Sequence, residues 1–280
     1  MNVRRWTALT KRELLKISRN PAAIGTSLML PILYLLLFGQ GFNFGAFLNS
    51  ESSAERAQFY AQYLLGAPDY FSYFAAGMVG FVTVTATLFV GANVIFDKLF
   101  GTLKRSVQSP ATATDIFGAR LVAGAVQPVG LAFLVLGLAI LLGKVGLAGL
   151  NVTASVGVVS GLEIVVAVLL LSSMFASLFL ALGFTIEQPQ TYFAVVNAIN
   201  LPVLLTSAAL YPWGLMPSWL QNIASYNPIT LAVEVLRIDL LGGAYYPAPA
   251  WRYLLALVAW AVEMFAIATY LTARAMAPKR

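Results

Sequence analysis

Residues 155–184 read SVGVVSGLEIVVAVLLLSSMFASLFLALGF, an apolar run in which Glu163 is the only charged residue. A transmembrane helix needs about 20 mostly apolar residues, so this run is long enough to cross a bilayer with some tilt. A helix that is apolar all round is buried in a large core or in lipid. The run therefore predicts an α-helix inside a membrane.

The rest of the chain contains further runs that meet the same length criterion, which makes about six in all. In chain order they are Ala22–Gly39, Ser72–Phe96, Phe117–Gly143, Ser155–Phe184, Tyr192–Tyr211 and Tyr253–Ala273. The predicted fold class is all-α: a polytopic membrane protein with six transmembrane helices.

The composition agrees with a membrane protein and excludes several kinds of chemistry. Hydrophobic residues make up 60% of the chain and charged residues 10%, whereas soluble chains average about 45–50% and roughly 25%. The chain has no Cys and no His. It therefore forms no disulfide, no Cys/His metal site and no His-based triad.

The basic residues predict the orientation of the chain. They gather in three segments: the N-terminus, the connection after the second run (Lys98, Lys104, Arg105, Arg120) and the C-terminus (Arg274, Lys279, Arg280). An even number of crossings puts all three on one side, and the positive-inside rule makes that side cytoplasmic. We expect a multi-pass protein of the cell (inner) membrane with both termini in the cytoplasm. The net charge of +6 is explained by topology and lipid headgroups, not by nucleic acid.

The N-terminal residues 3–19 have the pattern of a basic amphipathic helix. Trp6, Leu9, Leu14 and Ile17 supply an apolar side, and four basic residues follow the other side (Arg5, Arg12, Lys16, Arg19). Such a helix lies on the membrane surface, and Asn20-Pro21 ends it. It serves either as a topology anchor alone or also as a docking surface for a cytoplasmic partner.

The connection over residues 97–110 reads DKLFGTLKRSVQSP. Leu99, Phe100, Leu103 and Val107 are spaced as the apolar face of a short helix. One chain offers no place to bury that face on the cytoplasmic side. We therefore expect it to occupy a groove of a partner protein.

The two long connections on the other side carry aromatic residues that suit the headgroup level. In the first, Phe59–Tyr63 suggests a short interfacial helix. In the second, Pro212–Asn227 predicts a broken, partly re-entrant hairpin, which survives at membrane depth only if protein or a cavity surrounds it. Leu231–Leu241 predicts a further helix that carries Glu234 and Arg237 on its polar stripe.

Two acids lie inside predicted spans, Glu163 and Glu263. Such groups either hydrogen-bond within the bundle or belong to an ion pathway, so a gradient-driven secondary transporter or channel is an alternative function. A membrane-embedded enzyme would need a carboxylate pair or Ser–Lys chemistry, and no paired acids stand at close helical spacing. Gly157 and Gly161 form a small-xxx-small pattern that predicts close helix packing.

The sequence motifs, taken in order, resemble the permease subunits of type-2 ABC exporters of the drug-resistance and polysaccharide-export kind. The resemblance covers nearly the whole chain. Its motifs are TKRELLK at 10–16 with RNP at 19–21, GTLKR at 101–105 with SP at 109–110, YP at 211–212, PSWL at 217–220, YNPIT at 226–230 and EVLR at 234–237.

The resemblance implies one transmembrane domain over 1–280, with an interface helix at 1–20 and six membrane helices within 22–275. It implies a cytoplasmic coupling helix and an outer hairpin before the last span. The implied ATPase-coupling residues are Arg12, Glu13, Lys16, Asp97, Phe100, Gly101, Thr102, Leu103 and Arg105. Candidates for the substrate path or gate are Glu163, Glu263, Tyr211, Trp213, Asn227 and Pro228.

The resemblance also implies partners and a source of energy. Two permeases would associate, each contacting an ABC ATPase subunit that binds ATP and Mg²⁺. The chain itself contains no P-loop, so we expect no cofactor in it and no enzymatic activity of its own. Its predicted function is to move a drug-like molecule, lipid or glycan out of the cytoplasm or inner leaflet.

Overall fold

The computed structural model describes residues 3–19, 21–39, 53–102, 113–154 and 156–276. These residues form helices and connections and contain no β-strand. The elements are α1 (Val3–Ser18), α2 (Pro21–Tyr34) continuing as the π-helix η1 (Leu35–Gly39), α4 (Ser53–Tyr63), α5 (Tyr70–Leu99), α7 (Ala113–Lys144), α8 (Val158–Thr185), α9 (Pro189–Leu205), the 3-10 turn η2 (Trp213–Leu215), α10 (Ser218–Tyr226), α11 (Pro228–Leu241) and α12 (Ala250–Met276).

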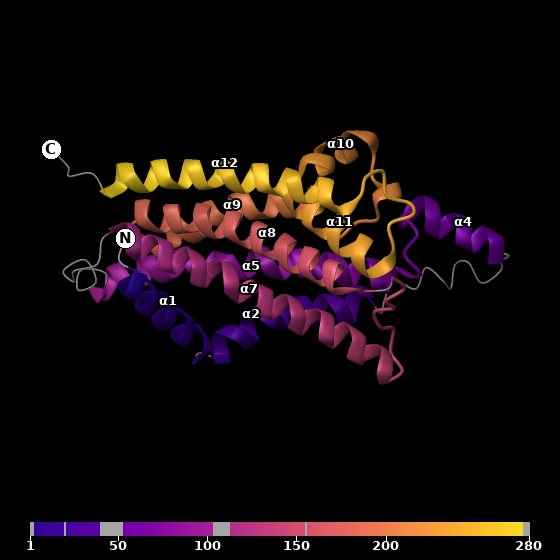
Figure 1. Cartoon of the computed structure of the whole chain (residues 1–280), viewed down its shortest axis with the longest axis horizontal. Coiled ribbons are helices and arrows are strands. Elements are labelled where there is room, and N and C mark those ends of the chain that lie inside the picture. Colours follow the sequence, from indigo (N-terminus) through magenta and orange to yellow (C-terminus); the bar gives the residue numbers. More distant parts are fainter. Residues whose placement is uncertain (1–2, 20, 40–52, 103–112, 155, 277–280) are drawn as a thin grey trace.

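The long helices run side by side along one axis, with α5 in the interior of the bundle (Figure 1). Helix α5 packs against α2, α7, α8, α9 and α11, and most of its side chains are buried. Helix α12 lies on the outside, against α8 and α11. A helix that is apolar over its lipid-facing side needs no protein cover in a bilayer.

Four helices in the described chain are long and apolar enough to cross a membrane: Tyr70–Leu99, Asp115–Lys144, Val158–Thr185 and Ala250–Thr272. The protein is therefore a membrane protein with several apolar helices. The first predicted span, Ala22–Gly39, corresponds to a shorter apolar helix over Gly25–Gly39. The fourth predicted span, Ser155–Phe184, began three residues too early, because α8 begins at Val158.

The fifth predicted span was too long. Helix α9 ends at Leu205, so Thr206–Tyr211 is not helical. Two contacts with the chain around α11 hold this non-helical stretch. The Asn227 side chain donates to the Thr206 hydroxyl at 3.1 Å, and the Ala208 amide donates to the Thr230 hydroxyl at 2.9 Å. The sequence stays apolar up to Tyr211, which is why the predicted span was too long. Side chains at and after the start of α11, and not a further helical turn, bind the backbone and side chains of this stretch.

The bundle has two distinct ends (Figure 1). We call the end with α1, Leu99 and the last turns of α12 the basic end, and the end with α4, α10 and α11 the hairpin end. The helices expected over residues 3–19 and around Phe59–Tyr63 are present as α1 and α4. Of the expected coupling helix, only the residues up to Thr102 are described, so its remainder, with Leu103 and Arg105, lies outside the described residues.

Glycines set the closest helix crossing, although not the glycines expected. A Cβ added to Gly91 of α5 would lie 2.0 Å from the Phe179 carbonyl of α8, and one added to Gly183 would lie 2.5 Å from the Gly91 carbonyl. The backbones of α5 and α8 therefore touch here. Gly157 and Gly161, predicted to pack closely, would each meet nothing within 4 Å among the described residues.

We expect Gly183→Ala to destabilise the protein and Gly161→Ala not to. Forcing a methyl group into the α5–α8 crossing costs about 1–3 kcal/mol, typical of overpacking. At Gly161 the same change meets open space and gains up to about 1 kcal/mol of helix propensity. Thermal unfolding of both variants in one detergent measures the difference. Equal melting temperatures would contradict the close crossing.

Candidate functional site

A buried ion pair organises the basic end. Asp97, in the last turns of α5, contacts Arg120 of α7 with its Oδ2 at 2.5 Å from Nη2. The other carboxylate oxygen accepts from the Thr102 hydroxyl at 2.8 Å. Between them, Gly101 has φ +70°, a left-handed conformation that suits glycine. This turn folds Thr102 back onto Asp97 and fixes where the connection leaves α5.

The same arginine also faces the N-terminal helix. Helix α1 packs against α7, and a narrow cleft between them is lined by Leu9, Arg12 and Glu13 on one side and Ile116, Ala119 and Arg120 on the other. Arg120 therefore lies between α1 and Asp97. Two segments that are far apart in the sequence, α1 and the connection after α5, meet at one side chain.

A third contact joins α5 to α8. The Lys98 ammonium donates to the carbonyls of Phe184 and Ile186, at 2.7 and 3.0 Å. The last carbonyls of a helix carry partial negative charge and lack helical partners, so the lysine closes the C-terminus of α8. Leu99 and Phe100 beside it are 58% and 78% exposed. The basic end thus exposes Leu99 and Phe100 beside residues that are held in place by these polar contacts.

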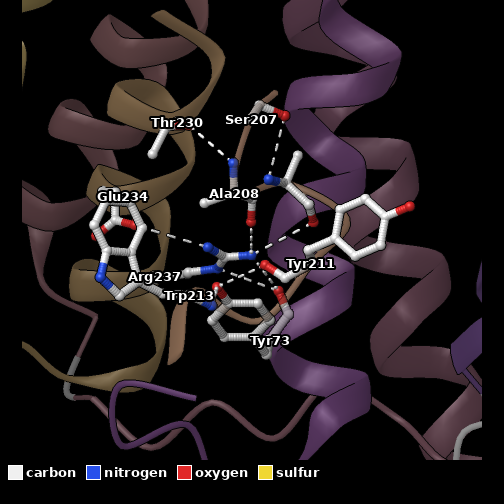
Figure 2. A network of polar contacts seen from close by, with 9 residues as sticks. Tyr73, Ser207, Ala208, Tyr211, Trp213, Thr230, Glu234 and Arg237 are labelled. Atoms are coloured by element: carbon white, nitrogen blue, oxygen red, sulfur yellow. Dashed lines mark hydrogen bonds and ion pairs between the residues drawn. The ribbon is translucent and has the colours of Figure 1, made fainter. Parts of the chain in front are cut away.

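The hairpin end is built around Arg237 of α11, which is fully buried. Figure 2 shows its guanidinium among backbone carbonyls. It donates to the Tyr73 carbonyl at 3.1 Å and to the Ala208 carbonyl at 2.9 Å. Its Cζ lies 3.4 Å from the centroid of the Tyr73 ring. One cation therefore joins α5, α11 and the chain that follows α9.

This arrangement follows from where α9 stops. The end of a helix leaves carbonyls without helical partners, and burial makes them costly unless another donor reaches them. Gly77 of α5 lets that chain come close, since a Cβ there would lie 1.9 Å from the Ala209 carbonyl. The Tyr73 hydroxyl then links the next residues, donating to the Tyr211 carbonyl at 3.2 Å and accepting from the Trp213 amide at 3.1 Å.

The helix expected over Leu231–Leu241 is present as α11, but its polar stripe, with Glu234 and Arg237, is buried. The segment folds inward because its carbonyl partners lie on α5 and after α9, which the local pattern does not reveal. One feature of the sequence could have indicated this burial: Arg237 follows Glu234 by three residues in a mostly apolar stretch. Glu234 itself is buried, with its Oε1 3.8 Å from Nη1 of Arg237. At that distance the two groups form an ion pair but no hydrogen bond.

The comparison with known families decides what kind of protein this is. Residues 4–241 match the family model described as ABC-2 type transporter. The chain belongs to the ABC-2 type transporter family. The match begins in α1 and ends at the last residue of α11. It therefore includes both the basic end and the Arg237 cluster.

Curated relatives support the assignment of this ABC-2 permease. The chain is 30% identical over 232 residues to the protein named "Putative transport permease ycf38" in Porphyra purpurea, which covers 82% of this chain and 72% of the relative. Proteins of the same name in Pyropia yezoensis and Cyanophora paradoxa are 29% and 26% identical, with 82% of this chain covered in each case. The protein is a transport permease of this family, whose members normally work with an ATPase partner.

The residues predicted for a substrate path do not lie together in the permease. Tyr211 and Trp213 lie beside Arg237 (Figure 2). Asn227 caps α11, because its side-chain oxygen accepts from the Ile229 amide at 2.9 Å, and Pro228 is the first residue of that helix. Glu263 stands apart on the exposed side of α12.

Glu163 of α8 has an acidic neighbour on another helix. It lies close enough to Asp239 of α11 for the two carboxyl groups to interact. Asp239 is only 6% exposed, and its Oδ2 has no hydrogen-bond partner in the described chain. Burial, and then the nearby Glu163, raises the pKa of Asp239 from 3.8 to about 7. The pair was not visible from helical spacing because its members lie on different helices.

We expect Arg237→Met to destabilise the permease more than Glu234→Gln. Removing the guanidinium leaves the buried Ala208 carbonyl, which lies beyond the end of α9, without its donor, at roughly 1–3 kcal/mol. It also removes the cation that stacks on the Tyr73 ring. Replacing Glu234 removes only a long ion pair and keeps the side-chain shape. Thermal unfolding and limited proteolysis after Tyr226 measure both effects. Equal losses would mean that the ion pair, and not the carbonyl contacts, holds the hairpin end.

The Asp239–Glu163 pair predicts a pH dependence. Asp239 has a raised pKa in the folded state, so its ionisation opposes folding, and stability falls as the pH rises from about 4 to about 7. Asp239→Asn should remove this part of the slope in a series of melting temperatures. Glu263→Gln is the matched control, because Glu263 lies apart from the pair. An unchanged slope in the Asp239 variant would contradict the coupling.

Proposed function

We propose that this permease is the transmembrane subunit of an ATP-driven exporter, which moves its substrate out of the cytoplasm or inner leaflet. The energy would come from ATP and Mg²⁺ bound to a separate ATPase subunit. The observation that carries the proposal is the Asp97–Arg120 contact, because Arg120 pairs with the last turns of α5 and also lines the cleft against α1. A force applied to either segment reaches the other directly.

The proposed topology has six spans within one transmembrane domain. The two additional spans would be α2 with η1, over Pro21–Gly39, and α9, over Pro189–Leu205. Both reach the lower end of the range for a spanning helix, about 17–25 residues. With six spans, the basic end faces the cytoplasm, in agreement with the positive-inside rule. Helices α10 and α11 would form the outer, partly re-entrant hairpin.

The ATPase would dock on the basic end. Arg12 is exposed and Glu13 half-buried on α1, and Lys16 lies on the same helix. Phe100 and Gly101 supply an apolar side chain and a turn at the start of the coupling segment, which Leu103 and Arg105 would continue. Apolar side chains that one chain leaves uncovered suit a groove on a partner. A second permease copy would complete the transport unit.

A gradient-driven transporter or channel is the second candidate, and the Glu163–Asp239 pair favours it. Buried carboxyl pairs take up and release protons near neutral pH. Against it, Glu263 lies apart from the pair, so no chain of acids connects the two ends within the described residues. This candidate requires a proton gradient and no ATPase, and Glu163→Gln would abolish transport.

Two glycines provide a matched test of the ATPase coupling. Gly101 and Gly146 both have positive φ, at +70° and +82°, and a Cβ added to either meets nothing within 4 Å. Gly101 lies at the basic end and Gly146 just after α7, at the opposite end. We expect Gly101→Val to abolish ATP-driven transport and Gly146→Val to leave it nearly intact, since the local strain is the same and only the place differs.

The measurement uses the permease purified together with its ATPase and reconstituted in vesicles. Deleting residues 6–19 should uncouple ATP hydrolysis from transport in the same way, while the permease alone hydrolyses no ATP. Normal transport by both altered proteins would refute docking at the basic end. Transport by the permease alone, driven by a proton gradient, would replace this proposal with the second candidate.

A further inference from the structure

A cavity of about 410 Å³ lies at the hairpin end, between α2 with η1, α5 and the chain after α9. Its volume is within the range of small-molecule sites, about 300–1,000 Å³. The lining residues are Tyr34, Phe38, Tyr70, Phe74, Leu210, Tyr211, Pro212 and Leu215. None of the resemblance motifs or predicted path residues, apart from Tyr211 and Pro212, pointed to this place.

The wall of the cavity is aromatic and uncharged. Tyr34 packs edge-on against Phe38, with ring centroids 5.5 Å apart, and Tyr70 stacks on Phe74 at 5.7 Å. No Asp, Glu, Lys or Arg is among the described lining residues. A charged group placed here would lose its hydration without gaining a counter-ion, which is costly. The cavity therefore selects an uncharged, apolar occupant.

The cavity has a closed floor and an open rim. Phe74 and Tyr70 are 3% and 8% exposed, whereas Tyr211 and Leu215 at the rim are 51% and 52% exposed. Leu33, Leu36 and Leu37 of α2 and η1, on the same helical stretch as Tyr34 and Phe38, are also exposed. Exposed leucines on a membrane protein suit contact with lipid chains. The rim therefore opens toward the hydrocarbon region.

We propose that this cavity binds a hydrocarbon chain of a membrane amphiphile. Its volume holds on the order of a dozen methylene-sized groups, if each occupies about as much space as a water molecule in the liquid. Dispersion contacts with the aromatic wall supply the binding energy. The polar headgroup stays outside, since the described lining residues offer no ionic partner.

The site is tied to the Arg237 cluster through one segment. Tyr211 lines the cavity, while its backbone carbonyl accepts from the Tyr73 hydroxyl at 3.2 Å. A bound chain therefore rests on the same residues that Arg237 and Tyr73 hold in place. The proposal concerns binding and requires neither a direction of transport nor an ATPase.

The experiment is photo-crosslinking with a long-chain alcohol that carries a diazirine on its chain, added to the intact permease in neutral phospholipid vesicles. Labelled positions are mapped by mass spectrometry. We expect labelling of residues 210–215 and 70–74 that saturates and that excess unlabelled alcohol suppresses. Exposed apolar residues elsewhere should be labelled in proportion to probe concentration, without saturation.

Leu215→Trp and Leu201→Trp form a matched pair of variants. The two leucines are 52% and 53% exposed, but only Leu215 lines the cavity. Leu215→Trp should lose the competitor-sensitive labelling, and Leu201→Trp should keep it. If Leu215→Trp does not fold, Tyr211→Trp fills the same rim. Labelling in the wild-type protein that fails to saturate, or that both variants change equally, would mean contact with bulk lipid only and would overturn the proposal.

Discussion

The hairpin end depends on one cation that satisfies backbone carbonyls. In a bilayer, a chain that leaves its helix must find internal partners for its polar groups. Here α9 ends at Leu205, and the guanidinium of Arg237 reaches the carbonyls of Tyr73 and Ala208 while it stacks on the Tyr73 ring. The positive charge of Arg237 is stabilised by these carbonyls and by the ring. Glu234, 3.8 Å away, therefore does not have to neutralise it alone. The short helices α10 and α11 can then fold back onto the bundle.

Helix α5 connects this cluster to the basic end. Near its start, Tyr73 supports Arg237, and in its last turns Asp97 and Lys98 hold α7 and α8. Side chains along nearly the whole length of α5 are buried. A helix packed this densely moves as a unit, because close-packed interiors transmit displacement instead of absorbing it. In an ABC-2 permease, this is the element placed to relate the two ends.

The sequence predicts the helices well and their partners poorly. Apolar length identifies the long spans, and amphipathic spacing identifies α1, because both depend on residues close together in the chain. The end of α9 at Leu205, the inward turn of Arg237 and the pairing of Glu163 with Asp239 depend on contacts between distant segments. Gly157 and Gly161 illustrate the difference: a small-xxx-small pattern shows that close packing is allowed, whereas Gly91 and Gly183 are where it occurs.

The contact between Gly91 and Gly183 has a mechanical consequence. Two rods that touch backbone to backbone at one place can pivot there, and Gly91 lies nearer the basic end of α5 than its other end. At 1.5 Å per residue the two arms measure about 12 Å and about 32 Å. A rigid lever with this fulcrum enlarges a sideways displacement of its short arm roughly 2.5-fold at the long arm and reverses its direction. If α5 tilts as a rigid rod about this crossing, a small displacement beside Asp97 becomes a larger one, in the opposite direction, at Tyr70 and Phe74 in the floor of the cavity.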